Sequence, residues 1–281
     1  MIHLKTPDEI AAIARGGAIL AALFRELGPR VVPGASTGEI DDFCEAFIRS
    51  HDGAEPAFKG LYGFPGSVCA SLNEEIVHGI PSPERTVREG DLLSIDVGVR
   101  LDGWCSDSAW TYAVGEVDEA SRTLLEVTRR ALDAAVSAAV PGRHVGDIGA
   151  AVMRTVEGTG LHIIRDLVGH GVGRDVHEEP QVPNYGRPGM GPLLREGMVI
   201  AIEPMLAWGS DRIRTLDDGW TVVTADGSRS AHFEHTVAIT REGPQVLTAL
   251  PQDAGAGDLP AATAGRGAEG GGSGAARGGS A

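Results

Sequence analysis

The nonapeptide VPGASTGEI at residues 32–40 returns as VPGRHVGDI at residues 140–148. Both copies carry Val-Pro-Gly, a glycine four residues later, and an acidic residue followed by isoleucine. Nine residues alone fit a shared helix-start signal as well as an internal duplication, because proline and glycine precede many helices. The pattern around them favours duplication, since each copy separates two predicted helices and is followed by predicted strands.

The helices are predicted from capping signals and from the spacing of apolar residues. Thr6-Pro7-Asp8-Glu9 is a capping box with proline at the first helical position, and Gly28-Pro29 ends that helix at about Leu27. Three more helices are expected, over 38–50, 119–139 and 145–157. Alternating apolar runs predict strands within 67–80, 91–99, 104–114, 161–168, 197–206, 219–225 and 231–240. This order predicts an α+β fold with two related halves around a mixed sheet region.

Composition narrows the class of protein. The formal net charge of −15 argues against nucleic-acid binding, because phosphate contacts need clustered Lys and Arg. Three cysteines without a CxxC pair indicate a reducing compartment and no disulfide framework. The chain shows no signal-peptide core and no run of 18 apolar residues, so we expect a cytoplasmic protein with no membrane partner.

The C-terminal segment differs from the rest of the chain. Glycine and alanine fill 19 of the 31 positions in 251–281, and Leu259 is the one large apolar residue there. Such a segment buries too little apolar surface to offset the entropy lost on ordering. We therefore expect one catalytic domain over residues 1–250 and a disordered tail over 251–281.

Two aspartates are predicted to share one face of a hairpin. Asp102-Gly103 between two apolar runs indicates a two-residue turn, so residue 98 pairs with Asp107. Asp96 then lies on the same face as Asp107, as a diagonal pair with Cα atoms about 7–8 Å apart. The apolar neighbours argue against a solvated face, and two acids there repel unless a cation lies between them.

Two glutamates repeat this pattern. Glu203 interrupts the apolar run VIAIEPM, and Glu234 interrupts AHFEHTVAI. A single acid in a strand usually faces solvent, whereas four acids in four apolar strands indicate a common site. Two divalent cations would neutralise four carboxylates, and one cation would leave two negative charges buried at high cost. If these strands meet, the sequence predicts a two-metal hydrolytic site.

The stretch GHGVGRDVHEEP at residues 169–180 supplies two histidines seven residues apart. Its three glycines and Pro180 disfavour a helix, so we expect both histidines on a loop. The stretch is not the HExxH motif of zinc proteases, because Gln181 stands where the second histidine is required. The predicted metal site has four carboxylates and needs one nitrogen ligand beside them. The spacing of the two histidines does not decide which of them supplies it.

Several segments together resemble type I methionine aminopeptidases, over about residues 3–249. They are NEEIVHGIP (73–81), the spacing from Asp96 to Asp107, GHGVGRDVHEEP (169–180), AIEPM (201–205), DGWTVVT (218–224) and FEHT (233–236). The resemblance implies a pita-bread (creatinase/aminopeptidase-like) fold, with two pseudo-symmetric halves around a curved, mainly antiparallel sheet. It implies removal of the initiator methionine from nascent polypeptides, near the ribosome, when the second residue is small. We also expect a monomer.

The resemblance further implies a role for each matching residue. The metal ligands would be Asp96, Asp107, His170, Glu203 and Glu234. Asp107 and Glu234 would bridge two divalent ions, Asp96 would bind one of them through both oxygens, and His170 and Glu203 would complete the other. Cobalt, manganese, iron and zinc all suit this ligand set. A hydroxide held between the ions would attack the scissile carbonyl, with Glu203 helping to move the proton.

Substrate contacts are implied in the same way. His177 would contact the scissile peptide, and His78 would stabilise the developing tetrahedral species. The methionine side chain would lie among Phe64, Cys69 and Trp220. Taken singly, His78 is equally compatible with a turn residue, and Cys69 and Trp220 with residues of the core.

Three positions depart from the family pattern. Leu61 stands where tyrosine is usual, Val176 where an aromatic residue often stands, and His232 where glutamine is usual. Leu61 and Val176 would border the methionine pocket and alter its shape. Strand alternation puts His232 on the same face as Glu234, and we hypothesise that it supports the metal ligands and shapes the pH profile of activity.

Two other functions use the same fold. Prolidases and proline-specific aminopeptidases share the metal pattern but usually carry a whole domain before the catalytic one, and the first metal acid here is already Asp96. Non-catalytic interaction proteins tend to lose metal ligands, whereas all five are present here. Type II methionine aminopeptidases carry a long helical insertion between the HEEP-like region and the following glutamate, and only 26 positions separate His177 from Glu203.

Overall fold

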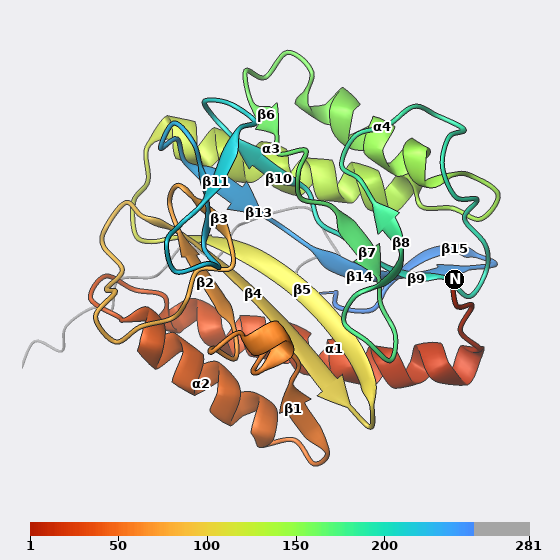
Figure 1. The fold of residues 1–281 in the computed structure, drawn as a ribbon, viewed down its shortest axis with the longest axis horizontal. Coiled ribbons are helices and arrows are strands. Elements are labelled where there is room, and N and C mark those ends of the chain that lie inside the picture. Colours follow the sequence, from red (N-terminus) through yellow and green to blue (C-terminus); the bar gives the residue numbers. More distant parts are fainter. Residues whose placement is uncertain (250–281) are drawn as a thin grey trace, which may run out of the picture.

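The computed structural model describes residues 1–249, and the predicted tail at 251–281 lies outside the described residues. The four expected helices are confirmed, and their ends lie within one residue of the predicted positions. Their bounds are α1 Pro7–Leu27, α2 Thr37–Arg49, α3 Glu119–Ala138 and α4 Val145–Val156. In Figure 1 the pair α1 and α2 lies below the strands, and the pair α3 and α4 lies above them.

The repeated nonapeptide forms the start of the second helix in each pair. The carboxylate of Glu39 accepts the backbone N–H of Ser36 before α2, and Asp147 accepts that of His144 before α4, both at 2.9 Å. Each of these cap residues also forms an isolated antiparallel bridge within its own half: Ser36 with Thr86, and His144 with Leu193. The nonapeptide is therefore a helix-start signal in both halves, and its equivalent placement supports the duplication.

The strands form four small antiparallel sheets among the described residues. The first contains β1 Ala54–Pro56, β2 Cys69–Leu72, β4 Leu92–Leu101 and β5 Trp104–Ala113. The largest runs β15-β14-β9-β7-β8, with bounds Gly243–Val246, His235–Thr240, Val199–Ile202, Gly169–Gly171 and Glu178–Val182. The other two are β13-β10-β6, at Ser230–His232, Met205–Ala207 and His162–Ile163, and β11-β12-β3, at Ile213–Thr215, Val222–Thr224 and Glu75–Val77.

The predicted hairpin register is confirmed. Leu101 pairs with Trp104 and Gly98 pairs with Asp107 across β4 and β5. The turn residues Asp102 and Gly103 have φ values of 52° and 78°, as a two-residue hairpin turn of this kind requires. The long β4–β5 ribbon crosses the middle of the molecule (Figure 1).

The prediction that Glu203 and Glu234 lie inside strands was wrong. Glu203 follows the end of β9 and precedes β10, and Glu234 lies between β13 and β14. At both places the chain passes from the five-stranded sheet to a three-stranded one, or back. Pro204 lacks the N–H that a continuing central strand would need, which is consistent with a corner at this point. The two glutamates therefore sit at corners where two sheets meet.

The prediction of a loop for both histidines of GHGVGRDVHEEP was half right. His170 lies in the short strand β7, and His177 lies in the loop just before β8. Gly169 and Gly171 serve close strand packing, because a Cβ at Gly169 would lie 2.3 Å from the Ala201 carbonyl oxygen. At Gly171 it would lie 2.2 Å from the carbonyl oxygen of Glu179. Both glycines are therefore needed where two backbones come close, whereas from the sequence alone they indicated a loop.

The core lies between the helices and the strands. Buried residues from α1, β4 and α3, such as Leu23, Ile95 and Leu124, belong to one continuous apolar cluster. Burying each such side chain contributes about 1.5–3 kcal/mol, which fixes the strands that carry the polar site. Among residues 1–249, no helix combines the length and the apolar character that a membrane crossing requires.

Candidate active site

Three of the predicted metal ligands meet at one point. Asp107 on β5, His170 on β7 and Glu234 between β13 and β14 each offer a ligand atom, and these atoms lie within 4.8 Å of one another. Glu203 joins them, since its Oε1 lies 3.5 Å from His170 Nε2, which is itself 3.8 Å from Asp107 Oδ2. Asp96 lies on β4, on the same face of the sheet as Asp107, and is the diagonal neighbour of Asp107 across β4 and β5. The structure therefore brings both halves of the chain to one cluster.

Hydrogen bonds between the sheets hold the backbone of this cluster. The Asp107 N–H donates to Thr236 Oγ1 at 3.0 Å, and the Thr236 hydroxyl donates to the Asp107 carbonyl oxygen at 2.7 Å. The Ser108 hydroxyl donates to the carbonyl oxygen of Glu234 at 2.8 Å. Asn184 donates to the carbonyl oxygen of Glu203 at 2.9 Å. Backbone contacts thus place Asp107, Glu203 and Glu234, and one carboxylate oxygen of Asp107 and one of Glu234 have no hydrogen-bond partner among the described residues.

The carboxylates are buried and incompletely paired. Asp96 Oδ1, Asp107 Oδ1 and Glu234 Oε1 are buried and have no hydrogen-bond partner among residues 1–249. Burial raises the pKa of Asp107 to about 7. Burial, and then repulsion from the Asp107 carboxylate, raises the pKa values of Asp96, Glu203 and Glu234 well above their ordinary range. Buried, unpaired acids of this kind fit a site for cations, which would hold them ionised.

The His170 ring is oriented as a metal ligand would be. Its Nδ1 lies 2.9 Å from the carbonyl oxygen of Gly171, so Nδ1 carries the proton and donates it there. That tautomer leaves the lone pair of Nε2 directed at Asp107 and Glu203. Burial lowers the pKa of His170 to about 4, which keeps the imidazole neutral and able to coordinate.

All the predicted site residues line one cavity of about 570 Å³. Phe64, Cys69 and Trp220 form an apolar part of its wall, and Cys69 pairs with Asp96 across β2 and β4. The Trp220 ring meets Phe64 edge-on at 5.2 Å and His78 at 6.4 Å between ring centroids. An apolar recess therefore lies beside the carboxylate cluster within the same cavity.

The two remaining histidines flank the cluster. The His177 ring lies 4.4 Å from the His170 ring, between centroids. His78 adopts a φ of 60°, a strained conformation for a residue with a side chain. Burial lowers the pKa values of both His78 and His177, so both rings are neutral near pH 7. Each can then donate one N–H to a polar group in the cavity.

Sequence reasoning missed Tyr62. This residue lines the cavity, is 76% exposed, and stacks on His177 with ring centroids 6.0 Å apart. Its φ of 51° is unusual for a non-glycine residue. The sequence feature that could have predicted its role is its place as an aromatic residue in the glycine-rich FKGLYGFPG (58–66), next to Leu61. Leu61 also lines the cavity, whereas Val176 is buried in the apolar cluster that includes Phe64 and Cys69.

His232 lies beside Glu203, and it does not share a strand face with Glu234 as predicted. Strand β13 ends at His232, so strand alternation does not extend to Glu234. The buried ring instead places Nε2 3.6 Å from Glu203 Oε2, and both ring nitrogens lack a hydrogen-bond partner among the described residues. Burial lowers its pKa to about 3, so the ring is neutral. Its influence on the pH profile stays a prediction.

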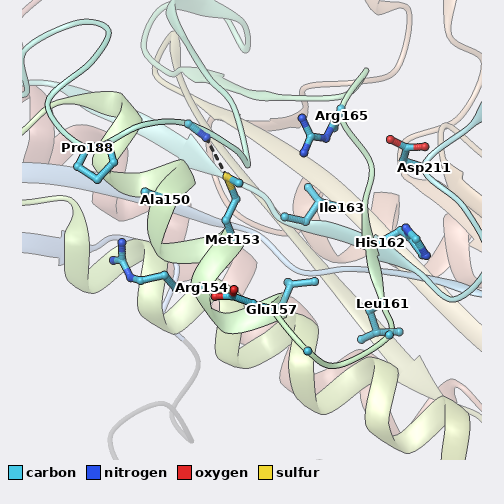
Figure 2. A pocket seen from close by; sticks show the side chains of 14 residues that line it. Ala150, Met153, Arg154, Glu157, Leu161, His162, Ile163, Arg165, Pro188 and Asp211 are labelled. Carbon is cyan, nitrogen blue, oxygen red and sulfur yellow. Dashed lines mark hydrogen bonds between the residues drawn. The ribbon is translucent and has the colours of Figure 1, made fainter.

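A second cavity of about 580 Å³ lies apart from these residues. Figure 2 shows its wall of α4 side chains and the segment 161–165, with the Gly186 N–H donating to Met153 Sδ at 3.4 Å. Its lining contains Arg154, Glu157 and Asp211 but none of the residues predicted from the motifs. The predicted chemistry is therefore confined to the first cavity.

Sequence comparison identifies related proteins over most of the chain. Residues 11–241 match the sequence model of metallopeptidase family M24. Methionine aminopeptidase 1 of Bacillus subtilis is 49% identical over 88% of this chain and 99% of its own length. A methionine aminopeptidase of Clostridium perfringens is 48% identical over 89% of this chain and all of its own.

Solved structures agree in fold. A methionine aminopeptidase of Thermotoga maritima superposes with a TM-score of 0.86 at 46% identity, over 88% of this chain and 99% of its own. A prolidase of Pyrococcus furiosus gives a TM-score of 0.71 at 25% identity, and 66% of the prolidase is covered. The predicted pita-bread α+β fold is confirmed, and the methionine aminopeptidase is the more similar of these two structures.

Proposed function

The chain belongs to metallopeptidase family M24 and, within it, to the methionine aminopeptidases, and from that premise we propose which residues remove the N-terminal methionine. The observation that carries the proposal is the buried cluster of carboxylates and one imidazole beside an apolar recess. The cluster supplies a place for catalytic metal, and the recess supplies a place for a methionine side chain.

We assign five residues to hold the metal: Asp96, Asp107, His170, Glu203 and Glu234. The unpaired buried oxygens and the neutral, oriented imidazole support this assignment. Four carboxylates balance the charge of two divalent ions, so we propose a two-metal site of cobalt, manganese, iron or zinc. When bound, such ions polarise a carbonyl oxygen and make water a strong nucleophile near neutral pH.

The side chains around the metal site move protons and orient the substrate. Glu203 accepts a proton at its carboxylate and returns it to the departing amine. His177 donates its N–H to the scissile peptide, which fixes the carbonyl for attack. His78 donates its N–H to the oxyanion that develops on that carbonyl.

The apolar recess selects methionine in this proposal. Phe64 and Trp220 offer ring edges and faces to a thioether, and sulfur–aromatic contacts contribute about 0.3–1.5 kcal/mol each. Cys69 adds a small, polarisable wall next to Asp96. We further propose that cleavage requires a small second residue, as the family resemblance implies.

The cellular setting belongs to the same proposal. The substrates are the N-termini of nascent polypeptides near the ribosome, and the enzyme works in the cytoplasm as a monomer. The three cysteines Cys44, Cys69 and Cys105 are free and buried, which suits a reducing compartment. The acidic charge of the chain supports recognition of peptide ends rather than of ribosomal RNA.

Release of methionine from Met-Ala-Ser is the test. We expect turnover that a chelator abolishes and that added divalent metal restores. Metal analysis of protein purified without added ions then identifies the bound element and its stoichiometry. Met-Trp-Ser is the matched control and should be cleaved far more slowly. Metal-independent or absent release would refute the proposal, and a preference for Ala-Pro peptides would instead support a prolidase.

A further inference from the structure

The segment before α1 contains a buried lysine that contacts the loop carrying His177. The Lys5 side chain is 4% exposed, and its Nζ donates to Glu178 Oε2 at 2.6 Å. Glu178 follows His177 directly and its side chain is 15% exposed. Stability is a weak explanation for such a pair, because the cost of desolvating two charges offsets most of their attraction. The pair joins two distant parts of the chain at the edge of the active site.

The second oxygen of Glu178 holds the loop in shape. Oε1 accepts the backbone N–H of Arg174 at 2.8 Å and lies 3.5 Å from that of Asp175. Gly173 leaves room for it, because a Cβ at that position would lie 2.2 Å from Oε1. One carboxylate therefore joins the start of the loop 173–178 to its end, with His177 between them. Burial raises the pKa of Glu178, but the hydrogen bond and charge of Lys5, together with the backbone hydrogen bonds from Arg174 and Asp175, outweigh it and hold the pKa below its ordinary value.

The opposite side of the loop is fastened to the β4–β5 hairpin. The Cys105 N–H donates to the carbonyl oxygen of Gly173 at 2.7 Å, and Arg100 donates to that of Arg174 at the same distance. The Arg174 guanidinium stacks 3.8 Å from the centroid of the Trp104 ring. These contacts fix residues 173–174. The Lys5–Glu178 contact fixes the end of the loop next to His177.

Lys5 is itself held in place. Its backbone N–H donates to the carbonyl oxygen of Gly197 at 2.6 Å, and the Gly197 N–H donates to Ile239 of β14 at 2.9 Å. The backbones are in close contact, since a Cβ at Gly197 would lie 2.7 Å from the Lys5 carbonyl oxygen. The next residue, Thr6, caps α1. A cation fixed on both sides can orient a partner that would otherwise move.

We propose that Lys5 is a positioning residue of this enzyme, which acts through Glu178 to set the place of the His177 imidazole against the scissile peptide. The inference rests on the proposed role of His177. Lys5 also neutralises a carboxylate that lines the same cavity as the candidate metal ligands. Loss of Lys5 therefore affects turnover rather than metal binding, because it touches none of the five assigned ligands.

The experiment compares Lys5→Met with wild type as the full-length, metal-loaded enzyme. We expect kcat on Met-Ala-Ser to fall roughly tenfold to a hundredfold, as a misplaced catalytic group predicts, with metal content unchanged. Glu178→Gln should change kcat in the same direction and covers the case in which Lys5→Met folds poorly. Arg229→Met is the control, because it removes a partly buried cation that pairs with Asp118, the cap residue of α3. It should leave kcat unchanged.

A double-mutant cycle and one spectroscopic signal separate positioning from a structural role. In a His177→Ala background, Lys5→Met should have no further effect on kcat. The NMR resonances of the His177 ring, assigned by their loss in His177→Ala, should shift or broaden in Lys5→Met. A lower melting temperature with unchanged kcat and an unchanged His177 resonance would overturn the proposal. Additive losses in the cycle would also overturn it.

The two proposals fail in different ways. If His177→Ala leaves turnover intact, the role assigned to His177 under the proposed function is wrong. The ring resonance still reports whether Lys5 positions that loop, because it requires no turnover. A shifted resonance with intact turnover would retain Lys5 as the residue that orders the loop and remove its catalytic consequence.

Discussion

The imidazole rings of His170 and His177 lie 4.4 Å apart at 65° to each other, although they belong to different parts of a hairpin. His170 comes from β7 and points its Nε2 at carboxylates, whereas His177 comes from the loop before β8 and contacts Tyr62. Two neighbouring histidines of one motif thus face different chemical groups, and their substitutions are expected to differ.

His170→Ala should weaken metal binding by more than about tenfold, because it removes a ligand and not merely the support of one. His177→Ala should retain metal and lower kcat roughly 10²–10⁴-fold, as expected when a group that transfers or shares a proton with the substrate is removed. Metal titration and steady-state kinetics of both variants check this. Equal loss of metal in the two variants would show that His177 is also a ligand.

Metal binding to the apo enzyme should weaken as the pH falls through about 7. Burial raises the pKa of Asp107 to about 7 in the absence of a cation, so protons compete with metal for this carboxylate below that pH. Calorimetric titration with Mn²⁺ at several pH values should show the affinity falling and proton release increasing on the acid side. Asp107→Asn should bind metal weakly at every pH. Constant affinity from pH 8 to pH 6 would contradict the assignment.

Tyr62→Gly should separate substrate binding from stability. A φ of 51° costs a non-glycine residue on the order of 1 kcal/mol, so glycine is expected to keep or raise the melting temperature. The lost ring should raise KM for Met-Ala-Ser several-fold, because Tyr62 lies over His177 in the lining of the cavity. An unchanged KM would place Tyr62 outside the substrate path.

Gly17→Ala should destabilise the protein despite the higher helix propensity of alanine. A Cβ at Gly17 would lie 2.2 Å from the carbonyl oxygen of Leu247, so α1 would be pushed off the segment after β15. Overpacking of this kind costs about 1–3 kcal/mol. Denaturant unfolding should show this loss in Gly17→Ala, and an unchanged free energy of unfolding would contradict it.

The hairpin and the helices were predictable because their signals are local. A two-residue Asp-Gly turn fixes the register of the strands beside it, so Asp96 and Asp107 fell on one face as expected. The capping box at Thr6 placed the start of α1, and the predicted start of the second helix at residue 38 lies one residue from Thr37. Where a turn or a cap determines the strand register or the helix start, the local sequence is enough to predict it.

The corners and the long-range contacts were not predictable in this way. Glu203 and Glu234 read as strand residues because apolar runs continue on both sides, and the change of sheet at each one depends on tertiary packing. The glycines around His170 led to the prediction of a loop, although they permit close strand packing. Lys5 has no local signal at all, since its partner Glu178 lies far along the chain. Such features become visible only when distant segments are side by side.

The cap residues Ser36 and His144 mark two halves, each built with its own helix pair and its own helix-start signal. The assigned metal ligands are divided between these halves: Asp96 and Asp107 come from the first, and His170, Glu203 and Glu234 from the second. Neither half alone holds a complete ligand set, so the catalytic centre is an interface.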